Sequence, residues 1–114
     1  MPELDPEDAK IVTLARSARA RGTADAGAAV RDEMGRAYTA TDVVLPSLIL
    51  SALQLAVAMA VSSGASSLEA AALVAEDGPT DADLAAVRDL GPKASVFVAG
   101  ADGVVRAVLT PSSG

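Results

Sequence analysis

The side chains best suited to chemistry in this sequence are carboxylates. Four of them form a cluster before and within a predicted helix start: Glu76, Asp77, Asp81 and Asp83. Carboxylate oxygens are the ligands that Ca²⁺ and Mg²⁺ prefer, but the spacing lacks the regular alternation of an EF-hand loop. Acidic residues are also expected where a helix begins, because they match the helix dipole. A helix start is therefore favoured over a cation site.

Most other catalytic chemistry is excluded by composition. The 114 residues include no Cys, no His and no Trp. The chain therefore has no thiolate or imidazole nucleophile, no Ser-His-Asp relay and none of the ordinary zinc ligands. We assign no catalytic residue, no metal ligand and no cofactor from the composition, and without Cys no disulfide indicates the compartment.

The charge balance argues against a nucleic-acid partner. Nine basic residues against fifteen acidic ones give a net charge of −6, which opposes binding to phosphates. The single Tyr and single Phe, Tyr38 and Phe97, offer no platform on which bases could stack.

Residues 43–68 carry no charge and approach the length of a transmembrane helix. Pro46 interrupts this stretch, polar side chains lie within it and no basic or aromatic residue anchors its ends, so a fully buried helix is favoured over a membrane span. Residues 1–8 are acidic and lack the apolar core of a secretory signal. We expect a cytoplasmic protein with no membrane partner.

The first element is a helix whose start has three matching signals. Asp5 fits its cap, Pro6 its first position and Asp8 a capping-box carboxylate, and the helix runs to about Arg21 and stops at Gly22. One apolar face is formed by Ile11, Leu14, Ala15 and Ala18. The last turns carry Arg16, Arg19 and Arg21, interpreted as a solvated, dipole-matched end rather than a ligand patch.

The other elements follow from apolar runs bounded by turn residues. The predicted strands are Ala26–Asp32, Arg36–Val44, Leu68–Ala75, Ala94–Ala99 and Val104–Leu109, and the predicted helices are Ser47–Ser63 and Asp81–Leu90. Leu68–Ala75 also suits a helix, but the turn residues after it favour a strand. Asp32 and Glu33 are placed in a solvated turn, residues 100–103 in a hairpin turn rather than a phosphate loop, and residues 110–114 in a loose tail.

The resulting order, αββαβαββ, predicts one α/β domain over residues 1–114 with helices packed on a mixed sheet. Two helix starts carry a capping-box pattern or its short-chain variant, Ser51-x-x-Gln54 and Thr80-x-x-Asp83. Each cap is worth about 1 kcal/mol.

Five segments in this order resemble the cytidine deaminases of the small, homotetrameric type. They are Gly27-Ala28-Ala29-Val30, Gly35-Arg36, Ser51-Ala52-Leu53, Pro79-Thr80-Asp81-Ala82-Asp83 and the strand-turn-strand around Asp102-Gly103. The resemblance covers nearly the whole chain and implies a three-layer α/β/α fold with a five-stranded mixed sheet, the first helix on one face and the other two on the opposite face. It also implies a homotetramer, with a dimer as an alternative.

The same resemblance assigns the family's chemical positions to residues that differ from the family's. It places Ser51, Thr80 and Asp83 at the zinc ligands, Leu53 at the proton-shuttling glutamate, and Asp42 and Val44 at the nucleoside contacts. Two hydroxyls and a carboxylate match zinc poorly, and leucine cannot carry a proton.

These replacements lead to one structural hypothesis and two functional ones. The two caps and Leu53 replace the zinc site and convert the pocket into packed core, or the caps are simply ordinary helix starts. In function, the chain is a zinc-free, inactive oligomeric or partner-binding module whose protein partner is unknown. The alternative is an active cytidine or deoxycytidine deaminase, as overall similarity suggests.

Overall fold

The structure, a computed structural model, describes residues 4–21 and 24–110. The predicted helix stop at Gly22 and most of the predicted tail, residues 111–114, lie outside the described residues. The helices are α1 (Pro6–Ala20), α2 (Ala52–Ser62) and α3 (Asp81–Leu90). The strands are β1 (Ala26–Asp32), β2 (Ala37–Thr41), β3 (Val43–Leu45), β4 (Leu48–Leu50), β5 (Leu68–Ala75), β6 (Ser95–Ala99) and β7 (Val105–Leu109).

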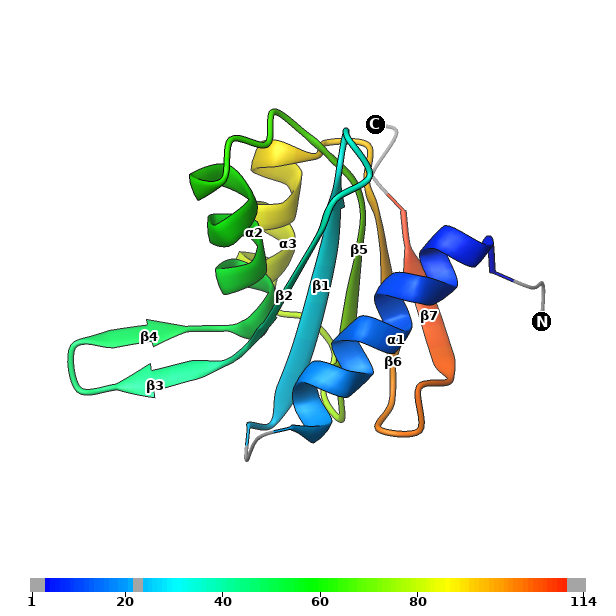
Figure 1. Ribbon diagram of the computed structural model, residues 1–114. Coiled ribbons are helices and arrows are strands. Elements are labelled where there is room, and N and C mark those ends of the chain that lie inside the picture. Colours follow the sequence, from blue (N-terminus) through cyan, green and yellow to red (C-terminus); the bar gives the residue numbers. More distant parts are fainter. Residues whose placement is uncertain (1–3, 22–23, 111–114) are drawn as a thin grey trace.

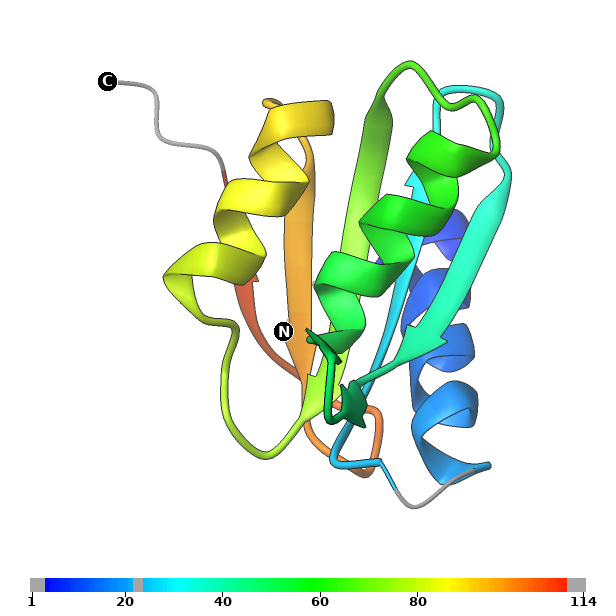
Figure 2. The ribbon, with the colours of Figure 1, turned by 90° about the vertical axis from the view of Figure 1, so that its left-hand side faces the viewer.

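Five strands form one mixed sheet in the order β2-β1-β5-β6-β7. Strands β5 and β6 pair in parallel and are connected through α3, whereas the other neighbours in this sheet pair antiparallel. Helix α1 covers one face of the sheet, and α2 and α3 cover the other (Figures 1 and 2). This arrangement confirms the three-layer α/β fold and the predicted element order, to which a small β3–β4 hairpin is added.

The central strands are apolar on both sides because helices cover both sides. In β5, Leu73 packs in the core beneath α2 and α3, whereas its neighbours Ala72 and Val74 pack in the core beneath α1. A strand covered on one side only would alternate apolar and polar residues. The nearly continuous apolar sequence of β5 is therefore a direct consequence of the three layers.

Small residues let α1 lie close to the sheet. A Cβ atom built on Gly27 of β1 would lie 2.1 Å from the carbonyl oxygen of Ala15 and 2.6 Å from the amide nitrogen of Arg19, both in α1. Real Cβ atoms do not approach other heavy atoms that closely. Glycine at this position therefore sets the distance between α1 and β1.

The predicted strand Arg36–Val44 is divided into two strands at Asp42. Strand β2 ends at Thr41, and β3 begins at Val43 in a separate two-stranded sheet with β4. Between them, the carboxylate of Asp42 accepts a hydrogen bond of 2.9 Å from the amide of Ala26. This side-chain bond ends the pairing with β1, and the chain leaves the sheet.

The predicted helix Ser47–Ser63 starts too early. Leu48–Leu50 forms β4, and α2 begins at Ala52. A short apolar run suits a strand or a buried helix equally well, and here Pro46 and Ser47 turn the chain back so that Val44 pairs with Ile49. Among residues 4–21 and 24–110, none of the helices has both the length and the apolar character that crossing a membrane requires.

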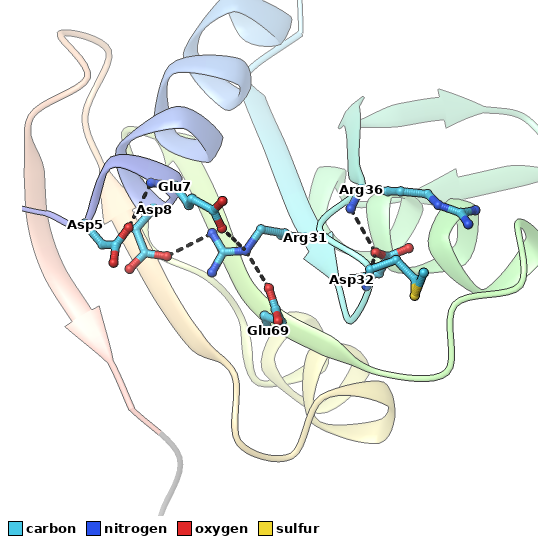
Figure 3. A network of polar contacts seen from close by, with 8 residues as sticks. Asp5, Glu7, Asp8, Arg31, Asp32, Arg36 and Glu69 are labelled. Atoms are coloured by element: carbon cyan, nitrogen blue, oxygen red, sulfur yellow. Dashed lines mark hydrogen bonds and ion pairs between the residues drawn. The ribbon is translucent and has the colours of Figure 1, made fainter.

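Polar contacts fasten the first turn of α1 to the sheet (Figure 3). The Arg31 guanidinium lies 3.0 Å from a carboxylate oxygen of Asp8 in α1 and 2.9 Å from one of Glu69 in β5, with Glu7 at 3.8 Å. Burial lowers the pKa of Arg31, but the bonds to Glu69 and Asp8 outweigh it and raise that pKa overall. Asp8 therefore binds Arg31, while Asp5 caps the helix as predicted by accepting from the amide of Glu7.

Asp32 was predicted to be solvated, but its side chain is buried under the β1–β2 turn. Its carboxylate accepts hydrogen bonds from the amides of Met34 and Arg36, each at 2.9 Å, and from the Tyr38 hydroxyl at 3.0 Å. Burial raises the pKa of Asp32, but these bonds outweigh it and hold the pKa below its ordinary value of 3.8. Burial and the bond to Asp32 together raise the pKa of Tyr38.

The neighbouring Glu33 is exposed and joins this turn to the loop before β5. Its carboxylate accepts from the hydroxyl of Ser66 at 2.7 Å and from the amides of Ser66 and Ser67. The Ser66 hydroxyl and these amides lower the pKa of Glu33 to about 2.

Substituting Gly27→Ala tests the contact between α1 and β1. We expect the free energy of unfolding to fall by about 3 kcal/mol, because overpacking displaces backbone rather than a side chain. Urea denaturation measures this change. The control is Gly78→Ala, since a Cβ at Gly78 meets nothing within 4 Å. Equal stability of the two variants would contradict the proposed close approach.

Substituting Asp32→Ala tests the buried turn. We expect a loss of about 2 kcal/mol at neutral pH, because three donors lose their acceptor. Since the pKa of Asp32 is lowered on folding, its contribution is full above the ordinary value of 3.8 and is lost as the pH falls through the folded pKa. The difference in the free energy of unfolding between wild type and Asp32→Ala, measured by urea titration, should therefore shrink as the pH is lowered. A gap that is independent of pH, or an equal loss in the exposed control Asp89→Ala, would refute this role.

Candidate functional site

A pocket of about 490 Å³ opens at one edge of the sheet, where β1 begins and β5 ends. Ala26 and Ala75 are paired across these two strands and both line it. Helices α2 and α3 also begin at this edge and contribute Ser51, Ala52 and Asp83. Ligand sites in open α/β sheets occur at the carboxyl ends of strands, so this pocket is the candidate functional site.

Both helix starts beside the pocket are closed by capping boxes, which confirms the two predicted patterns. At α2, the Gln54 amide donates to the Ser51 hydroxyl at 3.1 Å, and the Ser51 amide donates to the Gln54 side chain at 3.0 Å. At α3, the Asp83 amide donates to the Thr80 hydroxyl at 3.1 Å, and the Thr80 amide donates to the Asp83 carboxylate at 3.0 Å. At each helix start, the amide of the cap residue and the amide of the third helical residue thus have partners within the capping box.

A further hydrogen bond joins the two helix starts. The Ser51 hydroxyl donates to Asp83 Oδ1, while Asp83 Oδ2 accepts from the Thr80 amide. We call this bond between α2 and α3 the Ser51–Asp83 link. It brings together all three residues that the resemblance assigns to the family's zinc ligands, although they are up to 32 positions apart in sequence.

Leu53 takes no part in the pocket. Its side chain is fully buried and packs in the core between α2 and the sheet. The Leu53 part of the packed-core hypothesis is therefore supported. The conversion of the pocket into packed core is wrong, because the pocket remains open between Ser51, Asp83 and the start of β1.

The two predicted nucleoside-contact positions are separated by the structure. Asp42 lines the pocket, where its carboxylate also holds the amide of Ala26. Val44 lies on β3 with 72% of its surface exposed and is not among the described residues that line the pocket. The β3–β4 hairpin carries it away from the site.

The pocket is strongly acidic. Its charged lining residues are Arg19, Asp25, Asp42, Glu76, Asp77 and Asp83. Five carboxylates against one guanidinium oppose the entry of phosphates and other anions and favour ligands rich in hydrogen-bond donors.

Arg19 and Asp25 were not predicted as site residues. The arginines of α1 were interpreted as a solvated helix end, yet Arg19 lines the pocket, and its Nε donates to the carbonyl of Asp25 at 2.9 Å. Only the path of the chain from α1 into β1 brings both residues to this edge. No local sequence signal distinguishes Arg19 from its neighbouring arginines.

The predicted acidic cluster is divided by the structure. Glu76, Asp77 and Asp83 line the pocket, whereas Asp81 lies exposed in the first turn of α3. Within residues 4–21 and 24–110, no three His, Cys, Asp or Glu side chains are grouped so that they could hold a metal ion. The favoured interpretation as a helix start agrees with Asp81 and Asp83 in that first turn.

The donor set beside Ser51 does not fit the family's zinc. Its members are two hydroxyls and one carboxylate, and they are hydrogen-bonded to one another and to helix amides. Zinc in proteins is bound by thiolate, imidazole and carboxylate, and hydroxyls do not replace the first two.

Solved structures of known function share this fold. Cytidine deaminase from Burkholderia pseudomallei superimposes with a TM-score of 0.77 at 25% identity, covering 89% of this chain and 90% of that chain. Cytidine deaminase from Mycobacterium leprae superimposes with a TM-score of 0.74 at 21% identity, covering 93% of this chain and 94% of that chain. Cytidine deaminase from Mycobacterium tuberculosis superimposes with a TM-score of 0.69 at 24% identity, covering 81% of this chain and 85% of that chain.

Two sequence comparisons were informative in different ways. The search of curated proteins found no match to the chain. A family model described as cytidine deaminase-like matches residues 4–103, which is most of the chain. The chain therefore belongs to the cytidine deaminase-like family.

Proposed function

We propose that this protein is a metal-free, non-catalytic member of its family that acts as an oligomeric module or binds a protein partner. The observation that carries the proposal is the Ser51–Asp83 link. It joins α2 to α3 through Ser51 and Asp83, two of the three residues that the resemblance assigns to the zinc-ligand positions. The Ser51 hydroxyl already accepts one hydrogen bond and donates another, and a hydroxyl is in any case a poor ligand for zinc.

The environment of Leu53 supports the same proposal. A residue that moves protons must reach the reacting atoms and must titrate, and a leucine within the core does neither. The whole chain contains no Cys and no His that could bind the metal or transfer protons from another position.

A second candidate function is the deamination of cytidine or deoxycytidine. Two observations favour it: the pocket of about 490 Å³ is open, and the chain is 25% identical to the enzyme from Burkholderia pseudomallei over 89% of its length. An acidic pocket also accepts an uncharged nucleoside more readily than a nucleotide. This candidate requires a metal site that the donor set beside Ser51 does not provide.

Metal content and turnover distinguish the two candidates. We expect protein purified from zinc-supplemented cells to contain no stoichiometric zinc and to leave the absorbance of cytidine and deoxycytidine unchanged. Elemental analysis and a spectrophotometric assay measure these quantities. The Burkholderia pseudomallei enzyme, prepared in parallel, controls for metal loss during purification. One zinc ion per chain together with turnover would establish the second candidate.

The Ser51–Asp83 link is tested by comparing two cap variants. Ser51→Ala and Thr80→Ala each remove a capping hydroxyl, but only Ser51 also donates to the other helix. We expect Thr80→Ala to cost about 1 kcal/mol and Ser51→Ala about 2 kcal/mol, measured by urea denaturation.

The pair Ser51→Ala and Asp83→Ala completes the test as a double-mutant cycle. A coupling energy of about 1 kcal/mol is expected for residues in one hydrogen-bonded network. Equal losses in the two cap variants, with additive effects in the cycle, would show that the link contributes nothing.

A further inference from the structure

The carboxylates that line the pocket have no positively charged partner among residues 4–21 and 24–110. Every ion pair formed within those residues involves Arg31, which lies near the other end of β1. Arg19 is the one basic residue among the described residues that line the pocket, and its Nε donates to the backbone carbonyl of Asp25 rather than to a carboxylate. The negative charge of the pocket is therefore not neutralised by the described part of the chain.

The burial of Asp83 makes this lack of a counter-charge costly. Asp83 is 6% exposed, and Asp32 is the only other charged side chain among the described residues that is buried. Asp32 accepts three hydrogen bonds. Asp83 accepts two, one at each oxygen, from the Ser51 hydroxyl and the Thr80 amide. A carboxylate has sites for about four donors, and a buried charge is stabilised by an opposite charge. Asp83, which lines the pocket, thus keeps free acceptor sites and lacks a cation within the described chain.

The pocket carboxylates do not converge on one point. The loop before β1, the end of β2, the loop after β5 and the first turn of α3 supply Asp25, Asp42, Glu76, Asp77 and Asp83. In Figure 2 the loop after β5 and the starts of β1 and α2 lie together at the bottom of the sheet. No three acidic side chains in the described ranges are grouped so that they could hold a metal ion, and Mg²⁺ or Ca²⁺ requires about six oxygen ligands at one point. The matching ligand is a cation whose positive charges are spread along its length.

The apolar lining residues indicate that this cation is aliphatic. Small apolar side chains line the pocket, namely Ala26, Ala52, Leu73 and Ala75, and none of its described lining residues is aromatic. Quaternary ammonium groups are recognised by aromatic cages and therefore do not match. Primary ammonium groups donate to carboxylates, and methylene groups pack against small apolar side chains. The volume of about 490 Å³ is typical of pockets for small molecules.

We propose that the pocket binds a linear aliphatic polyamine, an alkyl chain that carries two or more ammonium groups. Asp42, Asp77 and Asp83 accept hydrogen bonds from separate ammonium groups, and the alanines contact the methylene groups between them. This inference goes beyond the proposed function, because it assigns a ligand to the pocket independently of any protein partner or assembly.

Isothermal titration calorimetry of the full chain with spermidine tests the proposal. The titration is done at physiological ionic strength, where attraction to charges more than about 8 Å away is screened. We expect one spermidine per chain, bound roughly a hundredfold more tightly than n-butylamine, because a monoamine engages only one carboxylate region at a time. A defined stoichiometry distinguishes a site from a diffuse layer of counterions around an acidic protein.

Matched substitutions locate the site. Asp77→Asn and Asp42→Asn each remove one pocket charge, and asparagine at position 42 keeps an oxygen for the Ala26 amide. The control is Asp81→Asn, since Asp81 is exposed like Asp77 and is close to it in sequence but does not line the pocket. We expect each pocket variant to weaken spermidine binding roughly tenfold, because a hydrogen bond to a charged group is lost. Asp81→Asn should bind spermidine as wild type does.

Circular dichroism establishes that the variants are folded, and the exposed substitution Asp77→Asn decides the question if Asp42→Asn does not fold. The absence of saturable spermidine binding would overturn the proposal, and so would displacement of spermidine by an equimolar amount of MgCl₂. Equal losses in Asp77→Asn and Asp81→Asn would show binding to the acidic surface in general and would also overturn it. Binding of cytidine without binding of spermidine would overturn it in favour of the second candidate function.

The two proposals fail separately when zinc content and turnover are measured on the same sample. A metal-free, inactive protein that does not bind spermidine would refute the polyamine site and leave the non-catalytic function intact. Zinc and turnover in a protein whose spermidine binding depends on Asp77 would do the reverse.

Discussion

Helices cover both faces of the central sheet, and the rest of the structure depends on this constraint. Strands β1 and β5 must be apolar on both sides, and most of the buried sheet residues beneath α1 are alanines, with Val74 and Phe97 beside them. Gly27 is the extreme case, because backbone atoms of α1 occupy the space that a side chain would need. Because α1 lies so close to β1, Arg19 near the end of the helix lies at the edge of the sheet where α2 and α3 begin. The pocket is therefore a product of the layering.

The two ends of β1 have contrasting roles. At its end, Arg31 and Asp32 bind α1, β5 and the following turn through ion pairs and hydrogen bonds. At its start, acidic side chains line an open pocket. A structural zinc stabilises folding by about 10 kcal/mol, whereas a helix cap contributes about 1 kcal/mol. Two capping boxes therefore stabilise the fold much less than a structural metal does.

Much of the fold could be predicted from residue patterns, because its strands and helices carry strong local signals. The caps at Ser51 and Thr80, the buried strand Leu68–Ala75 and the helix Asp81–Leu90 were all located correctly. The hairpin was missed because Leu48-Ile49-Leu50 is apolar in either conformation, and only pairing with β3 decides between them.

The site residues could be predicted only where a local sequence pattern marks them. Ser51, Thr80 and Asp83 were expected to lie together, and they do. The burial of Asp32 could not be predicted, because nothing in the neighbouring sequence shows that three donors converge on its carboxylate. Arg19 and Asp25 likewise acquire their position from tertiary packing, which leaves no mark on the adjacent sequence.

The hairpin and the pocket are contiguous in the chain. Leu50 is the last residue of β4, and Ser51, the next residue, caps α2 and donates to Asp83 of α3. A single peptide bond thus connects the exposed arm to the contact that holds the two helices together. The position of the hairpin and the position of the α2 cap are therefore fixed by neighbouring backbone atoms rather than by contacts through the core.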